Sequence, residues 1–344
     1  MATRRPLAAF SLAIAGALAL SACGAADAPA ESPAAPTTEE AESEPTDDAA
    51  EAPAAGTVTI EDNNGTHEIA VPPTAVVATD NRTFETLYDW DIQLVAAARS
   101  LMPDTIPYVD DDSIVDLGTH GDPDMEALTP LDPDLIVNGQ RFTQFHDDLA
   151  TYAPNAVVLE LDPRDGEPFE SELKRQVTVL GEIFAKQAEA AELSGALDAA
   201  LERVRAAYDP ADTVMGVITS GGNIGYIAPG TGRTLGWVFE SLGLTPALEQ
   251  EGSDDHQGDD ISPEAIAESN PTWILVMDRD AVMDEPDYVA GAEIVENPEG
   301  PLMNTTAVVE GNIVYMPADT YTNESIQTFT EFLNSFADAL EAAN

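Results

Sequence analysis

Positive charge is what this sequence has least of. Its 344 residues include 13 lysines and arginines against 64 aspartates and glutamates, a formal net charge of −51 at pH 7. Such a surface repels polyanions, so nucleic acid and anionic lipid headgroups are poor partners for it. The excess is compatible with a salty environment, which would screen the self-repulsion. The same scarcity makes the position of each arginine informative.

Cysteine occurs only once, at Cys23, so no disulfide can form within the chain. Arg4 and Arg5 precede an uncharged run over 7–20, and Leu20-Ser21-Ala22-Cys23 follows. A positive start, a short apolar run and small residues predict an export signal over 1–22. The tetrapeptide resembles a bacterial lipoprotein signal, whose cysteine is lipidated; an ordinary signal peptide with an incidental cysteine is the alternative. We therefore expect a lipid anchor at Cys23 on the extracytoplasmic face of the cell membrane.

Signatures of secreted hydrolases are also missing. There is no G-x-S-x-G nucleophile elbow and no closely spaced histidine pair for zinc. A secreted α/β enzyme is thus the less favoured alternative, and we expect no enzymatic activity. Residues 23–56 contain no lysine, arginine or aromatic residue. They cannot bury enough apolar surface to offset ordering, so we expect a disordered acidic tether there.

A short stretch occurs twice in the remaining chain. Glu126 and Glu264 each stand seven positions before a proline, Pro133 or Pro271, and an apolar run begins two residues later. Proline ends a helix because it has no N–H to donate, and the apolar run is typical of a strand covered on both faces. Chance similarity of short α/β segments is the alternative. The repetition predicts two lobes of similar α/β build.

Hydrophobic patterns place further elements around these copies. Asn63-Asn64-Gly65 between two alternating runs predicts a hairpin over 57–71. Between 167 and 208 the pattern is helical, and over 186–207 it predicts a long helix as the connection between the lobes. We therefore predict an N-terminal lobe at 57–165, a helical segment at 166–209 and a C-terminal lobe at 210–344.

Three arginines share a position in this scheme. Arg141 and Arg279 each follow the strand of one repeated copy, and Arg233 lies in a glycine-rich loop before a helix. Ligands of open α/β sheets bind at the carboxyl ends of the strands. A surface ion pair is the alternative for each arginine alone, but the shared placement favours a binding site for an anion.

Several short motifs occur in an order that resembles a known family. They are Gly118-Thr119, Pro123-Asp124-x-Glu126, Pro133-Asp134-Leu135-Ile136, Gly232-Arg233-x-x-Gly236-Trp237, His256-Gln257-Gly258, Ile261-Ser262, Asn270-Pro271 and Asp278-Arg279. Over about 57–344 the set is similar to the substrate-binding lipoproteins of ferric-siderophore ABC importers, in the branch that binds catecholates such as enterobactin, bacillibactin and petrobactin. The resemblance implies two α/β lobes joined by one rigid helix, with little closure on binding.

The resemblance also implies roles for particular residues. Arg141, Arg233 and Arg279, with Arg82 as a weaker fourth candidate, would hold the anionic complex. His256 and Tyr321 match residues that bind ferric iron directly, although Tyr321 falls one position away from the family pattern. Glu126 and Glu264 match the acidic residues that dock onto the permease.

The expected ligand is thus a ferric siderophore, with no cofactor, and the protein is expected to be a monomer. Phenolate oxygen and imidazole suit ferric iron, and three arginines can offset a negatively charged complex. His120 is expected at the edge of the cleft, and Tyr315 within a strand. A cobalamin or haem receptor of the same fold is the alternative, for which an aromatic-lined cleft poor in arginine would be typical.

Overall fold

The computed structural model describes residues 56–283 and 287–344. The predicted signal peptide, Cys23 and the tether as far as residue 55 lie outside these ranges. Within them, no helix has both the length and the apolar character that a bilayer span requires.

The chain begins with the predicted hairpin. Strands β1 (Gly56–Glu61) and β2 (Thr66–Val71) pair antiparallel in the register Gly56 with Val71. The Asp62 carboxylate accepts hydrogen bonds from the backbone N–H of Asn64 and Gly65, which closes the turn. Both strands of the hairpin contact helix α3 (Phe169–Phe184).

The first lobe contains a sheet of five parallel strands in the order β5-β4-β3-β6-β7. The strands are β3 (Val76–Ala78), β4 (Leu94–Ala97), β5 (Val115–Asp116), β6 (Leu135–Asn138) and β7 (Val157–Glu160). Between them lie α1 (Phe84–Asp89), α2 (His146–Tyr152) and the short 3-10 helices Arg99–Leu101, Pro107–Asp110, Met125–Leu128 and Gln140–Phe145. The central strands β3 and β6 are buried along their whole length, as expected for strands covered on both faces.

The second lobe contains a mixed sheet in the order β10-β9-β8-β11-β12. Its strands are β8 (Val214–Ser220), β9 (Asn223–Ile227), β10 (Asp259–Asp260), β11 (Trp273–Asp278) and β12 (Ile313–Tyr315). Strands β8, β11 and β12 are parallel, whereas β9 and β10 are antiparallel to their neighbours. The helices of this lobe are α5 (Gly236–Leu242), α6 (Pro263–Ser269), α7 (Gly291–Val295) and α8 (Thr306–Glu310), with 3-10 turns at Arg279–Val282 and Pro301–Asn304.

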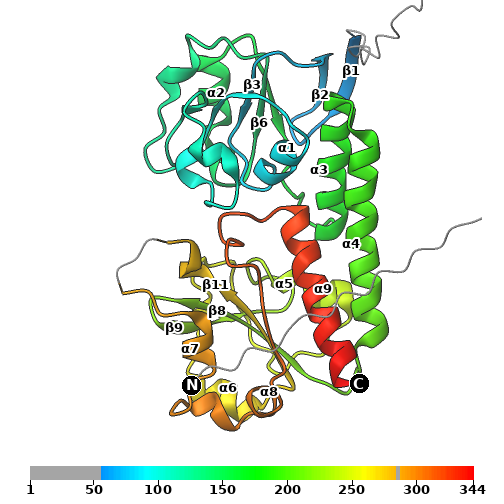
Figure 1. Ribbon diagram of the computed structural model, residues 1–344, viewed down its shortest axis with the longest axis vertical. Helices are drawn as coiled ribbons and strands as arrows, with labels where there is room; N and C mark the ends of the chain where they lie inside the picture. Colours follow the sequence, from blue (N-terminus) through cyan, green and yellow to red (C-terminus); the bar gives the residue numbers. More distant parts are fainter. Residues whose placement is uncertain (1–55, 284–286) are drawn as a thin grey trace, which may run out of the picture. The chain divides into compact units, whose positions relative to one another are not determined.

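Two helices, not one, occupy the segment between the sheets. Helix α3 ends at Ala185, whose backbone is left-handed (φ 56°), and α4 (Gln187–Ala207) turns back along it. Helix α4 also packs along the terminal helix α9 (Ile326–Ala343). Figure 1 shows α4 extending from beside the first sheet to beside the second. The predicted fold class, two α/β lobes joined by a long helix, is confirmed.

The repeated stretch folds similarly but not identically in its two copies. Asp132 and Asn270, the residues before the two prolines, both adopt left-handed backbone (φ 45° and 46°). The second copy forms helix α6, whereas the first forms only a 3-10 helix over Met125–Leu128. Pro130 explains the difference, because it lies inside the first copy and cannot continue a helix.

Candidate functional site

The three candidate arginines follow the ends of strands or a tight glycine loop, as the sequence predicts. Arg141 comes three residues after β6, Arg279 directly follows β11, and Arg233 lies between β9 and α5. Gly139 makes the first turn possible, because a Cβ there would lie 2.7 Å from an Asp80 carboxylate oxygen. A larger residue at 139 would require Asp80 or the turn that carries Arg141 to shift.

The structure brings these three arginines together around one aromatic ring. The guanidinium carbons of Arg141 and Arg279 both lie 4.8 Å from the centre of the Tyr321 ring, and that of Arg233 lies 5.5 Å from it. All three distances are in the range of cation–π contacts. We call Arg141, Arg233, Arg279 and Tyr321 the arginine cluster.

Two arginines of the cluster are held by hydrogen bonds from only part of the guanidinium. Arg141 donates from Nη2 to the Tyr321 carbonyl (2.9 Å), and Arg279 donates from Nη1 to Asp280 (2.8 Å) and to Ser220 Oγ (3.1 Å). Other donors of the cluster are buried and make no hydrogen bond to a described residue: Arg141 Nη1, Arg233 Nε, whose nearest carboxylate is Glu324 at 3.8 Å, and Arg279 Nε. The cluster thus keeps donor capacity that no described protein group uses.

Burial and the positive charge of the cluster shift the pKa values of the groups in and around it. Burial raises the pKa of the Tyr321 phenol, but Arg279 and Arg141 outweigh it, so the pKa lies below its usual value. Burial lowers the pKa of the Arg141 guanidinium, and Arg233 lowers it further. Burial and the charge of Arg141 also lower the pKa of His120. His120 therefore lies within the electrostatic reach of the cluster.

A second charged group, centred on Glu324, lies beside the cluster. Glu324 is 3% exposed and accepts hydrogen bonds from Arg82 (3.2 Å), Gln140 (3.0 Å) and Thr234 (2.9 Å), and Arg233 Nε lies 3.8 Å away. Burial raises the Glu324 pKa, but the arginines, led by Arg82, bring it below its usual value. Glu324 follows β12 in sequence, yet its partners come from both lobes.

Arg82, the fourth candidate, is already paired in this structure. Its guanidinium donates to Asp162 (3.0 Å) and to Glu324, and its own backbone N–H donates to Asp80 (2.9 Å). Burial lowers the Arg82 pKa, but the carboxylates, first Glu324, raise it above its usual value. Arg82 thus neutralises buried carboxylates and has less charge to offer a ligand than the arginine cluster.

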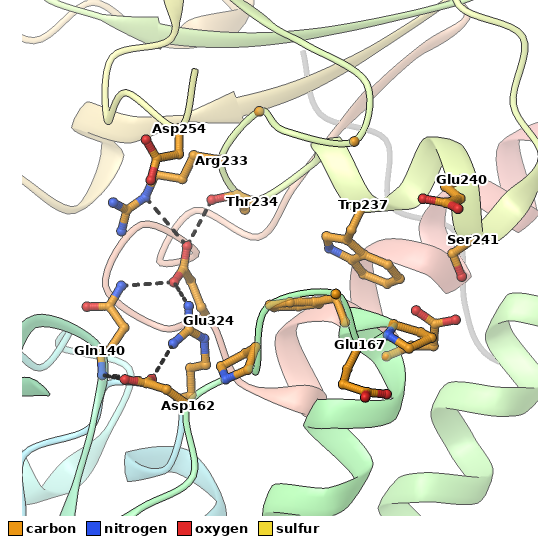
Figure 2. Close-up of a pocket in the computed structure, with 18 of the residues that line it drawn as sticks. Gln140, Asp162, Glu167, Arg233, Thr234, Trp237, Glu240, Ser241, Asp254 and Glu324 are labelled. Carbon is orange, nitrogen blue, oxygen red and sulfur yellow. Dashed lines mark hydrogen bonds and ion pairs between the residues drawn. The ribbon is translucent and has the colours of Figure 1, made fainter. Parts of the chain in front are cut away.

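A cavity of about 1010 Å³ lies next to these groups. Arg82, Arg141 and Arg233 line it, whereas Arg279, Tyr321 and His256 do not. Figure 2 shows Arg233, Thr234 and Gln140 converging on Glu324 at one end and Trp237 at the other, near Glu240 and Ser241 of α5. The volume is that of a pocket for a medium-sized organic ligand.

Two aromatic residues of this cavity had no assigned role in the sequence. Phe169, at the start of α3, and Trp237, in α5, lie with ring centres 5.2 Å apart. The Trp237 Nε1 donor is buried and has no partner among the described residues. The Gly-Arg-x-x-Gly-Trp motif contained Trp237, so its link to Arg233 was visible in the sequence, whereas Phe169 gave no signal.

The predicted iron ligands differ in their surroundings. Tyr321 is half-buried in the arginine cluster, whereas the His256 side chain is half-exposed, with Nδ1 3.9 Å from Asp255. The described residues contain no group of three His, Cys, Asp or Glu side chains arranged to hold a metal ion. Tyr315 lies in β12, as predicted, and donates to Glu296 (2.7 Å).

Glu126 and Glu264 have matching positions in the two lobes. Both are exposed, and both stand two residues after a side chain that caps the helix N-terminus. The caps are Asp124, which accepts from Ala127 N–H, and Ser262, which accepts from Ala265 N–H. The repeated stretch therefore presents an exposed carboxylate at the same position in each lobe.

Comparisons with known proteins concern the family and the fold. The model of the periplasmic binding protein family matches residues 76–320. The ferric-anguibactin-binding protein FatB of Vibrio anguillarum is 29% identical over 77% of this chain and 81% of its own length. The petrobactin-binding protein YclQ of Bacillus subtilis is 24% identical over 81% of this chain and 86% of its own length.

A solved structure supports the fold. The catecholate-siderophore binding protein VctP of Vibrio cholerae superposes with a TM-score of 0.70 at 24% identity, covering 83% of this chain and all of VctP. At this identity the match concerns the fold alone.

Proposed function

The chain belongs to the periplasmic binding protein family, and from this premise we propose that it captures an anionic ferric siderophore of the catecholate type and delivers it to an ABC importer. The family is one of binding proteins, and we expect this member to have no enzymatic activity. The proposed ligand-binding groups are Arg141, Arg233 and Arg279, with the adjoining cavity as the space for the ligand.

The arginine cluster is the observation that carries this proposal. A protein with a net charge of −51 brings three of its few arginines around one ring, and some of their donors make no hydrogen bond to any residue that the structure describes. At ~4 Å and an effective dielectric constant of ~20, each guanidinium attracts a unit anion with roughly 4 kcal/mol before desolvation is subtracted. Catecholate oxygens attached to aromatic rings match both the charge and the flat faces of these groups.

The relatives point to the same class of ligand. The names of FatB, YclQ and VctP specify ferric anguibactin, petrobactin and catecholate siderophores. We place the ligand of this chain in that class without assigning it to one of the three.

The proposal also assigns residues to delivery of the ligand to the permease and to anchoring of the protein at the membrane. We propose that Glu126 and Glu264 dock onto basic groups of the permease, because each presents an exposed carboxylate at the same position of a repeated unit. We further propose that Cys23 carries the lipid anchor on the extracytoplasmic face, and that the protein acts as a monomer.

Direct binding of iron is also proposed for His256 and Tyr321. It applies to siderophores that leave coordination sites on the metal open, since a hexadentate ligand needs no protein oxygen or nitrogen. An absorbance titration with a tetradentate and a hexadentate ferric catecholate tests it. A new ligand-to-metal band with the tetradentate complex alone is expected, and its persistence in both His256→Ala and Tyr321→Phe would remove the two residues from this role.

Tryptophan fluorescence tests the main proposal. Trp237 lines the cavity, so a ferric catecholate bound there should quench its emission. We expect saturable quenching with submicromolar affinity for ferric enterobactin or a related complex, and loss of the signal without loss of binding in Trp237→Phe. A response to haem or cobalamin but to no catecholate would replace the proposal by a receptor for those ligands.

A further inference from the structure

Tyr321 lies in a segment that is neither helix nor strand. The backbone of this segment is held in place, whereas the Tyr321 side chain can rotate. The segment joins β12 to α9. Its backbone is tied to the first lobe, because Arg141 donates to the Tyr321 carbonyl and Asn81 Nδ2 donates to the Thr322 carbonyl (2.8 Å). Thr105 Oγ1 also donates to Asp319 (2.5 Å). These contacts hold the main chain and leave rotation about the Tyr321 side-chain bonds as the available movement.

The Tyr321 side chain resembles one ring of the proposed ligand. It is an aromatic ring with one phenolic oxygen, and the guanidinium carbons of three arginines lie 4.8–5.5 Å from its centre. A catecholate ring adds a second oxygen to the same aromatic face.

With Tyr321 in this place, the cluster is closed to a ligand. Arg141 Nη1, Arg233 Nε and Arg279 Nε are buried while they make no hydrogen bond to a described residue. The cavity of about 1010 Å³ reaches Arg141 and Arg233 but not Arg279. An anion that is to use all three arginines therefore needs one of the groups of the cluster to move.

Tyr321 is the group best suited to move. Arg279 is held by Asp280 and Ser220, and Arg141 is held by a backbone carbonyl of the fixed segment. Arg233 is attracted to the buried carboxylate of Glu324, 3.8 Å from its Nε. We propose that the Tyr321 side chain is the resident occupant of the arginine cluster, and that an aromatic ring of the ligand takes its place on binding. This inference rests on the proposed function and deepens it, because it makes Tyr321 a determinant of affinity. A tyrosine that has left the arginines is also free to reach iron.

The sign of one mutational effect tests the inference. If Tyr321 competes with the ligand, Tyr321→Ala should bind ferric enterobactin about tenfold more tightly than wild type, because no cation–π contacts are lost on binding. Tyr321→Phe keeps the ring and should stay within about threefold of wild type. Tyr321→Leu fills the space without a π face, so it should behave like the alanine variant and replaces it if that variant does not fold.

Matched controls separate this inference from the proposed function. Tyr88→Ala removes an exposed tyrosine that packs on Tyr108 and should leave the affinity unchanged. If wild type binds ferric enterobactin and the alanine and leucine variants bind equally or more weakly, Tyr321 is a platform for the ligand and the inference is wrong while the function stands. If neither wild type nor any variant binds a ferric catecholate, the proposed function fails and the inference fails with it.

A second measurement follows the ring itself. In protein labelled with fluorotyrosine, the fluorine resonance that Tyr321→Phe lacks belongs to Tyr321. Addition of the diamagnetic gallium complex of enterobactin should move this resonance toward the position of the exposed Tyr88. A bound complex that leaves the resonance in place would show that the ring keeps its position, and would overturn the inference.

Discussion

At the scale of single residues, arginine side chains of this site differ in their surroundings. Arg82 is surrounded by the carboxylates of Asp80, Asp162 and Glu324, and its charge is neutralised within the protein. Arg141 has one hydrogen bond to a carbonyl and a buried donor without a partner among the described residues. Both arginines keep one buried donor without a hydrogen-bond partner among the described residues, so the difference between them is that carboxylates neutralise the charge of Arg82.

Removal of a cluster arginine should weaken ligand binding more than folding. Arg141→Ala and Arg279→Ala are each expected to reduce the affinity for ferric enterobactin by about 1–3 kcal/mol, as for other charge-assisted contacts. Isothermal titration measures the affinity, and Arg203→Ala is the control, because Arg203 pairs with Asp338 and Glu341 on the exposed side of α4 and α9. Unchanged affinity in both cluster variants would remove these residues from the site.

Asp80 should make the free energy of unfolding depend on pH between about pH 5 and pH 8. Burial, and then Asp162, raise the pKa of this carboxyl to about 7. In the unfolded chain Asp80 loses its proton near pH 4, so between pH 4 and 7 the folded state binds a proton that the unfolded state has released. Stability from this group is thus present at low pH and lost as pH rises, by about 2 kcal/mol from pH 5 to 8.

Urea unfolding of wild type and Asp80→Asn at pH 5 and pH 8 measures this effect. The histidines contribute equally to both proteins, so the difference between the two pH dependences isolates Asp80. The variant should lose less stability than wild type on going from pH 5 to pH 8. Equal losses would show that Asp80 is already ionised at pH 5.

The sequence could predict part of this site because some site residues stand next to strands that the sequence reveals. Arg141 and Arg279 follow strands that are visible as apolar runs, and parallel pairing brings the carboxyl ends of such strands to one edge of each sheet. Glu324 could not be found in this way, because its partner Arg82 is 242 positions away in sequence. Phe169 was likewise hidden, because one aromatic residue at a helix start carries no signal of its neighbours.

At the scale of elements, hydrophobic periodicity predicted whether a long element is a helix or a strand. It did not predict the turn between α3 and α4 or the shortest elements. The hairpin, the central strands and α9 follow from alternation or helical periodicity. The long helix predicted over 186–207 is α4, whereas the left-handed turn at Ala185 that separates it from α3 has no sequence feature of its own. The short elements β5, β10, α7 and α8 were also missed, because two to five residues carry too little pattern.

Glycine at the α3–α4 junction should stabilise the protein. Ala185 is exposed and left-handed, a conformation that costs an alanine roughly 1 kcal/mol and a glycine little. Ala185→Gly is therefore expected to raise the free energy of unfolding by about 0.5–1 kcal/mol, measured by urea denaturation. Ala191→Gly is the matched control, because Ala191 is exposed inside α4, where glycine should destabilise by about 1 kcal/mol. Loss of stability in both variants would contradict the left-handed assignment.

At the scale of the whole molecule, the local and the overall charge have opposite signs. The arginine cluster attracts an anion over a few ångströms, whereas the net charge of −51 repels it at longer range. The two ranges can be separated by salt, because the screening length falls from about 30 Å at 0.01 M to about 3 Å at 1 M ionic strength. Contacts within the buried cluster are screened less than charges on the surface.

Association of the anionic ligand should therefore become faster with salt. We expect the association rate constant of ferric enterobactin, measured by stopped-flow tryptophan quenching, to rise several-fold between 0.02 and 0.5 M sodium chloride, because the long-range repulsion is screened first. Potassium chloride should have the same effect, which distinguishes screening from binding of a particular cation. Arg279→Ala should show a similar salt dependence with faster dissociation, since it changes the local contacts and leaves the overall charge almost intact. An association rate that falls with salt would mean that the field of the arginine cluster extends beyond the cleft and dominates the approach of the ligand.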